Sequence, residues 1–125
     1  MTIAYWCVFI TILLPYVWVA FARAPGFTLQ KNRVPRIACD AYEGVQQRFY
    51  WAHLNGLEAI APFSIAVIIA HNLQADQQSI DHLAMIFVGL RIAHALAYAA
   101  DAGLLRSLLF TGGMVCMVAI FFSGI

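Results

Sequence analysis

Charged and hydrogen-bonding side chains interrupt a strongly apolar stretch of the chain. Arg48, Asn55 and Glu58 recur there at helical spacing: at about 100° per residue, Arg48 and Asn55 lie about 20° apart, and Asn55 and Glu58 about 60° apart. These three residues therefore form one polar stripe, whereas His53 points about 140° away from Arg48 and Glu58 and must face a different neighbour. A charge inside a membrane helix is costly and persists where it is paired or lines a wet cavity.

A second polar stripe follows in the next apolar stretch. Arg91, His94 and Tyr98 stand at i, i+3 and i+7, so they share one helix face. Arginine binds carboxylates through two parallel hydrogen bonds, and a carboxylate such as Glu58 can hold an ammonium group. The two stripes together predict a site for a zwitterionic, peptide-like or carboxylate-rich molecule. The alternative is structural, with Glu58 paired to Arg91 or Arg48 only to hold two helices together.

The other candidate ligands support weaker alternatives. Four of them gather around one turn and could form a metal site, although solvated turn residues are the simpler interpretation and no metal is assigned: His71, Asp76, Asp81 and His82. The three cysteines form no Cys-x-x-Cys pair, which excludes the common metal and redox motifs. Cys39 is expected to be exposed, since it lies outside the apolar runs.

The composition is that of an integral membrane protein. Of the 125 residues, 63% are hydrophobic and 10% are charged, against roughly a quarter charged in a soluble domain. A span needs about 20 mostly apolar residues, and four stretches qualify, at about residues 2–22, 44–72, 79–100 and 104–124. Two of the connections are short, which makes the helices that they join antiparallel neighbours. We therefore predict an all-α membrane protein, with a single four-transmembrane-helix antiparallel bundle over residues 1–125.

The basic residues predict the orientation of the bundle. Arg106 lies beside the third connection, the second connection has no Lys or Arg, and five basic residues lie in or beside the first: Arg23, Lys31, Arg33, Arg36 and Arg48. The positive-inside rule places the first and third connections in the cytoplasm and both termini outside. The net charge is only +1 and no Lys/Arg cluster forms a recognition helix, which excludes a nucleic-acid partner.

The two stripes also carry a family resemblance. Residues 48–63, RFYWAHLNGLEAIAPF, resemble the second-helix signature of the MAPEG family, the membrane-associated proteins in eicosanoid and glutathione metabolism. Arg91-x-x-His94-x-x-x-Tyr98 followed by Arg106-Ser107 resembles the signature of the third and fourth helices, and NRVPR at 32–36 resembles a run of the short bacterial branch. The resemblance covers residues 30–110. It implies a left-handed four-helix bundle, similar to the microsomal glutathione transferases, assembled as a homotrimer in the bacterial cytoplasmic membrane.

The resemblance further implies glutathione as co-substrate, bound between neighbouring subunits near the cytoplasmic face. The implied reaction is attack by the glutathione thiolate on a lipophilic electrophile or hydroperoxide dissolved in the bilayer, which requires a nearby cation or donor to lower the thiol pKa. Arg106 and Ser107 are the implied catalytic pair. The implied binding residues are Asn55, Glu58, His94 and Tyr98, with Arg48 and Arg91 supporting the site or holding the glutathione carboxylates.

Three positions depart from the family pattern. Trp51 replaces an Arg, Gly56 replaces the Asp after the Asn, and Phe110 stands where many members have Tyr. The interval from Tyr98 to Arg106 is also one residue shorter than in the eicosanoid-synthesising members, so eicosanoid synthesis is not expected. These departures predict weak glutathione affinity or a different thiol. They also keep open a second function, a non-catalytic accessory subunit of a larger membrane complex; a transporter or channel is a third and weaker alternative.

Overall fold

The computed structural model describes residues 1–125 as an all-helical chain with four helices long and apolar enough to cross a membrane. Their bounds lie within two residues of those predicted. The helices are α1 (Ile3–Arg23), α2 (Leu29–Arg33), α3 (Pro35–Asp40), α4 (Gly44–Asn72), α5 (Gln77–Ala99) and α6 (Gly103–Phe122). The long connection between the first two spans contains the short helices α2 and α3. Pro35 begins α3, a position where proline loses no helical hydrogen bond.

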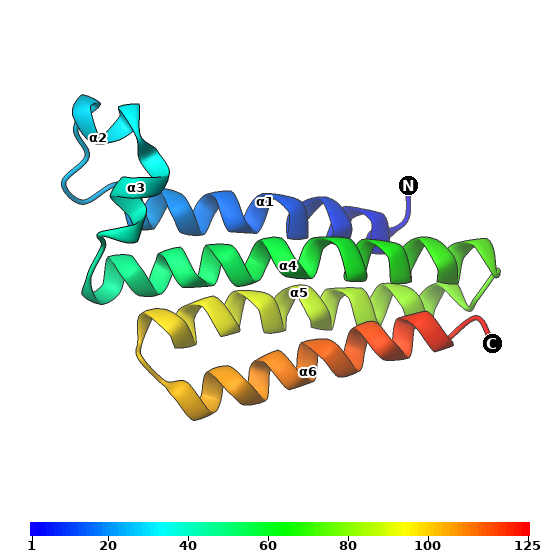
Figure 1. Ribbon diagram of the computed structural model, residues 1–125. Helices are drawn as coiled ribbons and strands as arrows, with labels where there is room; N and C mark the ends of the chain where they lie inside the picture. The colour runs from blue at the N-terminus through cyan, green and yellow to red at the C-terminus, as the bar shows by residue number, and fades with distance from the viewer.

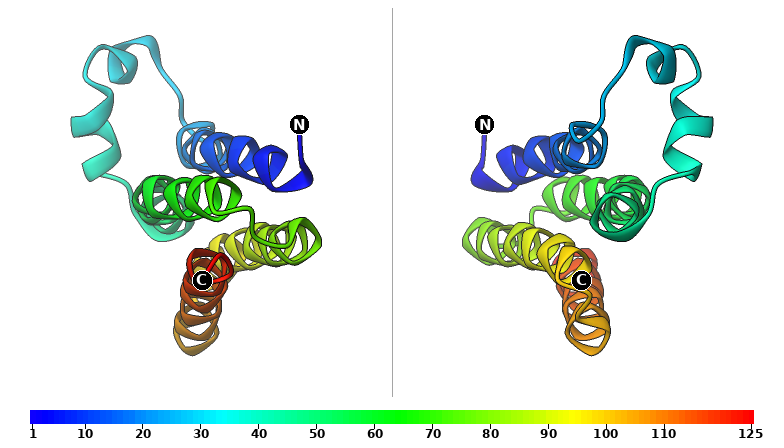
Figure 2. Two further views of the ribbon diagram at one scale, coloured as in Figure 1. Left: turned by 90° about the vertical axis from the view of Figure 1, so that its right-hand side faces the viewer. Right: turned by 90° about the vertical axis from the view of Figure 1, so that its left-hand side faces the viewer.

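The four long helices run antiparallel to their sequence neighbours, as predicted (Figure 1). Both chain termini lie at the same end as the α4–α5 turn, and the α5–α6 turn lies at the other end (Figure 1). Seen end-on, α4 and α5 lie between α1 and α6 (Figure 2). Consistent with this arrangement, α1 packs chiefly on α4 and α6 chiefly on α5. One long face of α6 is therefore uncovered.

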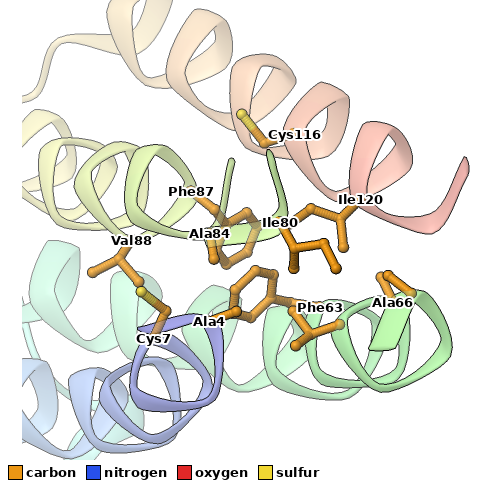
Figure 3. Close-up of a cluster of buried hydrophobic side chains, with 12 residues drawn as sticks. Ala4, Cys7, Phe63, Ala66, Ile80, Ala84, Phe87, Val88, Cys116 and Ile120 are labelled. Atoms are coloured by element: carbon orange, nitrogen blue, oxygen red, sulfur yellow. The ribbon is translucent and has the colours of Figure 1, made fainter. Parts of the chain in front are cut away.

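The core consists of small, branched aliphatic and aromatic side chains contributed by all four long helices (Figure 3). Phe63 of α4 and Phe87 of α5 stack with ring centroids 3.9 Å apart and an interplanar angle of 5°. Cys7 and Cys116 are buried in this core, and Cys39 of α3 is buried outside it. The expectation of an exposed Cys39 was wrong, because α3 turns this side chain inward.

A close helix crossing explains one departure from the family pattern. Gly56 of α4 faces Pro15 of α1 so closely that a Cβ at Gly56 would lie 2.9 Å from Pro15 Cγ. A carboxylate-bearing Asp does not fit in this space. Small residues at such positions let membrane helices approach one another. Because α1 and α4 lie close together here, Nδ1 of His53, one turn before Gly56, lies 2.8 Å from the Pro15 carbonyl oxygen. His53 thus faces a different neighbour, α1, as predicted.

Candidate functional site

The two polar stripes meet through a buried arginine. Arg91 of α5 is 7% exposed, and its Nη2 donates to the Asn55 carbonyl oxygen at 3.1 Å and to Asn55 Oδ1 at 2.6 Å. These bonds join α4 to α5 in the middle of the bundle. Hydrogen bonds from a charged donor are among the stronger ones in proteins. Arg91 therefore holds Asn55 in place.

Glu58 is not tied to either arginine. Arg91 donates to Asn55, and Arg48 Nε donates to the Ala99 carbonyl oxygen at 3.1 Å. The structural alternative, in which Glu58 pairs with Arg91 or Arg48, is therefore wrong, because Glu58 forms no hydrogen bond or ion pair with either arginine. The carboxylate of Glu58 remains exposed, where it can meet a ligand.

Arg48 has a local structural role. Its bond partner, Ala99, is the last residue of α5, and carbonyls at a helix C-terminus lack helical donors and favour a cation. Arg48 lines neither of the two cavities described below. The remaining residues of the predicted site all line one or the other.

The first cavity is a polar hollow of about 300 Å³. It lies where the end of α5 and the beginning of α6 face the middle of α4. Five predicted site residues line it together with Phe110 and Thr111: Asn55, His94, Tyr98, Arg106 and Ser107. Binding sites for small molecules are of this size or larger. We call it the polar hollow.

The second cavity adjoins the first and is mostly apolar. It measures about 230 Å³, and Asn55 and Phe110 line both cavities. Glu58 and Arg91 are its charged wall residues, and the rest of the wall is small or apolar: Ala59, Pro62, Phe87, Gly113, Met114 and Met117. We call it the apolar cavity. A molecule with a polar and an apolar part, or two molecules that react with each other, could occupy the two cavities together.

Arg106 is the available cation of the polar hollow. Its guanidinium carbon lies 4.6 Å from the centroid of the Tyr98 ring, a cation–π contact, and the guanidinium makes no hydrogen bond to the protein. The side chain stands in the first turn of α6, where the helix dipole also favours an anion. Its donors are thus free for a carboxylate or a thiolate.

Ser107 and His94 differ in their exposure and in their hydrogen bonds. Ser107 is exposed, and its hydroxyl donates to the Gly103 carbonyl oxygen at 3.1 Å, so its oxygen can still accept a hydrogen bond. His94 is 2% exposed, with its ring 5.1 Å from Tyr98 and 6.1 Å from Phe110 between centroids. Its Nδ1 is buried without a hydrogen-bond partner. Such atoms are rare in folded proteins.

The candidate metal ligands around the α4–α5 turn do not gather into a site. Asp81 Oδ1 accepts from the Ala4 backbone N–H at 2.7 Å and from Gln77 Nε2 at 2.8 Å. His71 contacts the Val67 carbonyl oxygen and Thr2. These side chains therefore fasten α1 to α4 and α5.

Sequence reasoning missed the apolar half of the site. Phe110 was noted only as a departure, and Thr111, Met114 and Met117 were not singled out, although all of them line the cavities. The signal available was their spacing from Arg106 and Ser107 on α6. Residues three, four and seven positions apart share a helix face, so the face that carries Arg106 continues through Phe110 to Met114 and Met117.

The sequence matches one known protein family. A model of the MAPEG family matches residues 3–125, which is nearly the whole chain. No curated protein and no solved structure matches it. The protein therefore belongs to the MAPEG family, and it is an integral, multi-pass membrane protein with four spanning helices.

Proposed function

We propose that this protein is a membrane-bound glutathione-dependent transferase or peroxidase that acts on lipophilic electrophiles or hydroperoxides. Membership of the MAPEG family supports a glutathione-related role in general. The observation that carries the more specific proposal is Arg106, which has no hydrogen-bond partner in the protein and lies in a polar hollow directly beside an apolar cavity.

The donor set fits glutathione. This tripeptide carries two carboxylates, one ammonium group and a thiol. Arg106 can bind a carboxylate or the thiolate, Glu58 can hold the ammonium group, and Asn55 and Tyr98 offer further polar contacts. The unpartnered Nδ1 of His94 adds a polar atom close to the same wall. A thiolate beside a cation at a helix N-terminus has a lowered pKa, so Arg106 would favour the reactive form.

The proposed chemistry needs no resident cofactor. In conjugation, the thiolate sulfur forms a bond to an electrophilic carbon, and either a leaving group departs with its electron pair or the addition product takes up a proton. In peroxide reduction, the thiolate sulfur forms a bond to the outer oxygen, the O–O bond breaks, and the departing alkoxide takes up a proton to become an alcohol. The thiol of a second glutathione then attacks the sulfur of the resulting glutathione sulfenic acid, forms glutathione disulfide, and the sulfenic oxygen leaves as water. The part of the apolar cavity that is lined by Phe87, Met114 and Met117 would hold the lipophilic partner.

We also propose that the protein assembles as a homotrimer. The polar hollow opens on the surface of one subunit, and the exposed face of α6 carries large apolar side chains, among them Leu105, Leu108 and Val115. A neighbouring subunit that packs on α6 would cover the hollow and exclude water from it.

The orientation in the membrane is also a proposal. The basic residues in or beside the first and third connections support an orientation with these connections in the cytoplasm and both termini outside. A bacterial cytoplasmic membrane is part of the same proposal.

A non-catalytic accessory subunit is the second candidate function. The departures at Trp51 and Phe110 favour it, because they remove an arginine and a hydroxyl group that the family pattern supplies. Arg48 does not replace the missing arginine, since it donates a hydrogen bond to the end of α5. Such a subunit would keep the bundle and purify with a stoichiometric partner.

A glutathione titration followed by thiolate absorbance in the ultraviolet separates the two candidates. The enzyme proposal expects a saturable thiolate signal near neutral pH with the wild-type protein. The expected signal is lost in Arg106→Ala and retained in His82→Gln, which changes an exposed side chain at the opposite end of α5. If calorimetry detects no binding at millimolar glutathione, the enzyme proposal is wrong.

A further inference from the structure

The connection between α1 and α4, residues 24–43, projects sideways from the bundle. Figures 1 and 2 show it at the level where α1 ends and α4 begins, directed away from α1 instead of continuing along the helix axes. We call it the α2–α3 segment. Within it α2 packs on α3, and α3 packs on α4. In a membrane crossed by the four long helices, a segment that leaves the bundle sideways at the helix ends would lie at the depth of the lipid headgroups.

The α2–α3 segment has a defined shape. Gln46 of α4 donates from Nε2 to the Ala22 and Pro25 carbonyl oxygens, at 2.9 Å each. Arg23 binds Asn32 across the segment, and Thr28 Oγ1 accepts from the Lys31 backbone N–H at 3.2 Å. The side chains on its surface are therefore held in a fixed arrangement.

Large apolar side chains on this segment have no protein neighbour to cover them. The exposed fractions are 54% for Phe27, 81% for Leu29, 51% for Val34 and 69% for Ile37. The spanning helices also expose apolar residues, but those meet lipid tails. Here the apolar side chains stand beside basic ones, a combination typical of surfaces that lie in the membrane interface.

Basic side chains are interleaved with the apolar ones. Lys31, Arg33 and Arg36 are all exposed. Lys31 Nζ donates to the Gly26 carbonyl oxygen, whereas the guanidinium groups of Arg33 and Arg36 make no hydrogen bond to the protein. Basic clusters next to a spanning helix attract anionic lipids. The charge of this surface is thus complementary to a negatively charged headgroup layer.

We propose that the α2–α3 segment is a docking surface for anionic phospholipid headgroups. Lys31, Arg33 and Arg36 bind the phosphates, while Leu29 and Ile37 enter the adjoining acyl region. A free phosphate would satisfy the cations but would leave the apolar side chains in water, which is why the surface matches a lipid. This inference does not depend on glutathione chemistry.

The first test measures lipid preference in vesicles of phosphatidylglycerol and phosphatidylcholine, using spin-labelled lipids and the full chain. The wild-type protein is expected to prefer phosphatidylglycerol, and high salt should weaken the preference through screening. In the triple variant Lys31→Gln, Arg33→Gln, Arg36→Gln the preference should fall about five-fold or more, since one surface cation contributes about that factor. The matched control, Asp40→Asn with Glu43→Gln, should keep or increase it. An unchanged preference in the triple variant overturns the proposal.

The second test measures depth. The three native cysteines are buried, so a spin label can be directed to Ile37→Cys, with Gln78→Cys in the α4–α5 region as the exposed control. The label at 37 should be reached by oxygen more than by a water-soluble nickel complex in phosphatidylglycerol vesicles, and the label at 78 should show the reverse. A label at 37 that is equally open to the nickel complex overturns the proposal. The proposal is also overturned if the label at 37 stays protected from the nickel complex in lipid-free detergent and loses this protection when the subunits dissociate. In that case a second copy of the protein, and not lipid, covers the surface.

Discussion

The two ends of the bundle use similar polar residues in opposite ways. At the end that holds the termini and the α4–α5 turn, Asp81 accepts two hydrogen bonds. Both ring nitrogens of His71 have partners, and its ring lies 4.4 Å from that of Tyr5 between centroids. In the region that reaches from the α5–α6 turn to the middle of α4, Arg106 and Glu58 make no hydrogen bond to the protein, and His94 Nδ1 is buried without one.

This difference distinguishes polar residues that stabilise the bundle from polar residues that are available for function. A polar side chain in an apolar setting is stable when its hydrogen bonds are satisfied, and it then serves mainly to join helices. Donors and acceptors left free around a hollow are available to a ligand. The end with satisfied partners should therefore control stability, and the end with free donors should control activity.

The largest effect is expected from Arg106→Ala. Removal of a charged donor that stabilises a developing or bound anion typically lowers the rate about 100-fold or more, while stability should hardly change because Arg106 has no hydrogen-bond partner. The measurement is conjugation of a generic lipophilic electrophile by purified protein in vesicles. Arg106→Lys should restore part of the rate. Full activity in the alanine variant would show that the hollow is not the reactive site.

Asp81→Ala and Glu58→Ala make a matched pair, one in each of the two regions compared. Asp81→Ala leaves the Ala4 N–H and Gln77 without their acceptor and should lower the free energy of unfolding by about 1–2 kcal/mol. Glu58→Ala removes an exposed carboxylate without a partner and should change it by less than about 0.5 kcal/mol. Unfolding in mixed micelles measures both. The comparison fails if Glu58→Ala proves the more destabilising of the two.

Phe110→Tyr should extend the comparison, because it adds a hydrogen-bond donor to the region with free polar groups. Phe110 lines both cavities and is 41% exposed, so a hydroxyl can be added without overpacking. One new hydrogen bond contributes about 1 kcal/mol, which corresponds to about five-fold tighter glutathione binding by calorimetry. Weaker binding would mean that the added hydroxyl group obstructs the ligand at this position.

The smallest effect concerns Asp76, which caps the N-terminus of α5. Hydrogen bonds from Ser79, including the backbone N–H at 2.8 Å, hold the pKa of Asp76 below its ordinary value. Because the folded pKa is the lower one, the cap stabilises the protein above the ordinary pKa of the carboxyl group and is lost as the pH falls through the depressed value. Melting temperatures should show a slight additional decrease in acid that is absent in Asp76→Asn. An identical pH profile for the two proteins would contradict this role.

The sequence predicted the spans and the two stripes, because these follow from composition and helical periodicity, and it predicted the family through the resemblance of its motifs. It also predicted that His53 faces another neighbour, which proved to be Pro15 of α1. It was wrong in one alternative, the pairing of Glu58 with Arg91 or Arg48, and in the expected exposure of Cys39. Both depend on distances between segments remote in the chain, and angular position on one helix does not determine those distances.

The membrane location and the helix faces were thus determined by the sequence alone, since apolar length and a period of about 3.6 residues are local properties. Only the tertiary structure decided which polar groups are satisfied. The axial position of α5 between α4 and α6 brings Arg91 to Asn55 and leaves Arg106 free over the ring of Tyr98. Hydrogen-bond satisfaction depends on ångström distances between helices, and packing sets those distances.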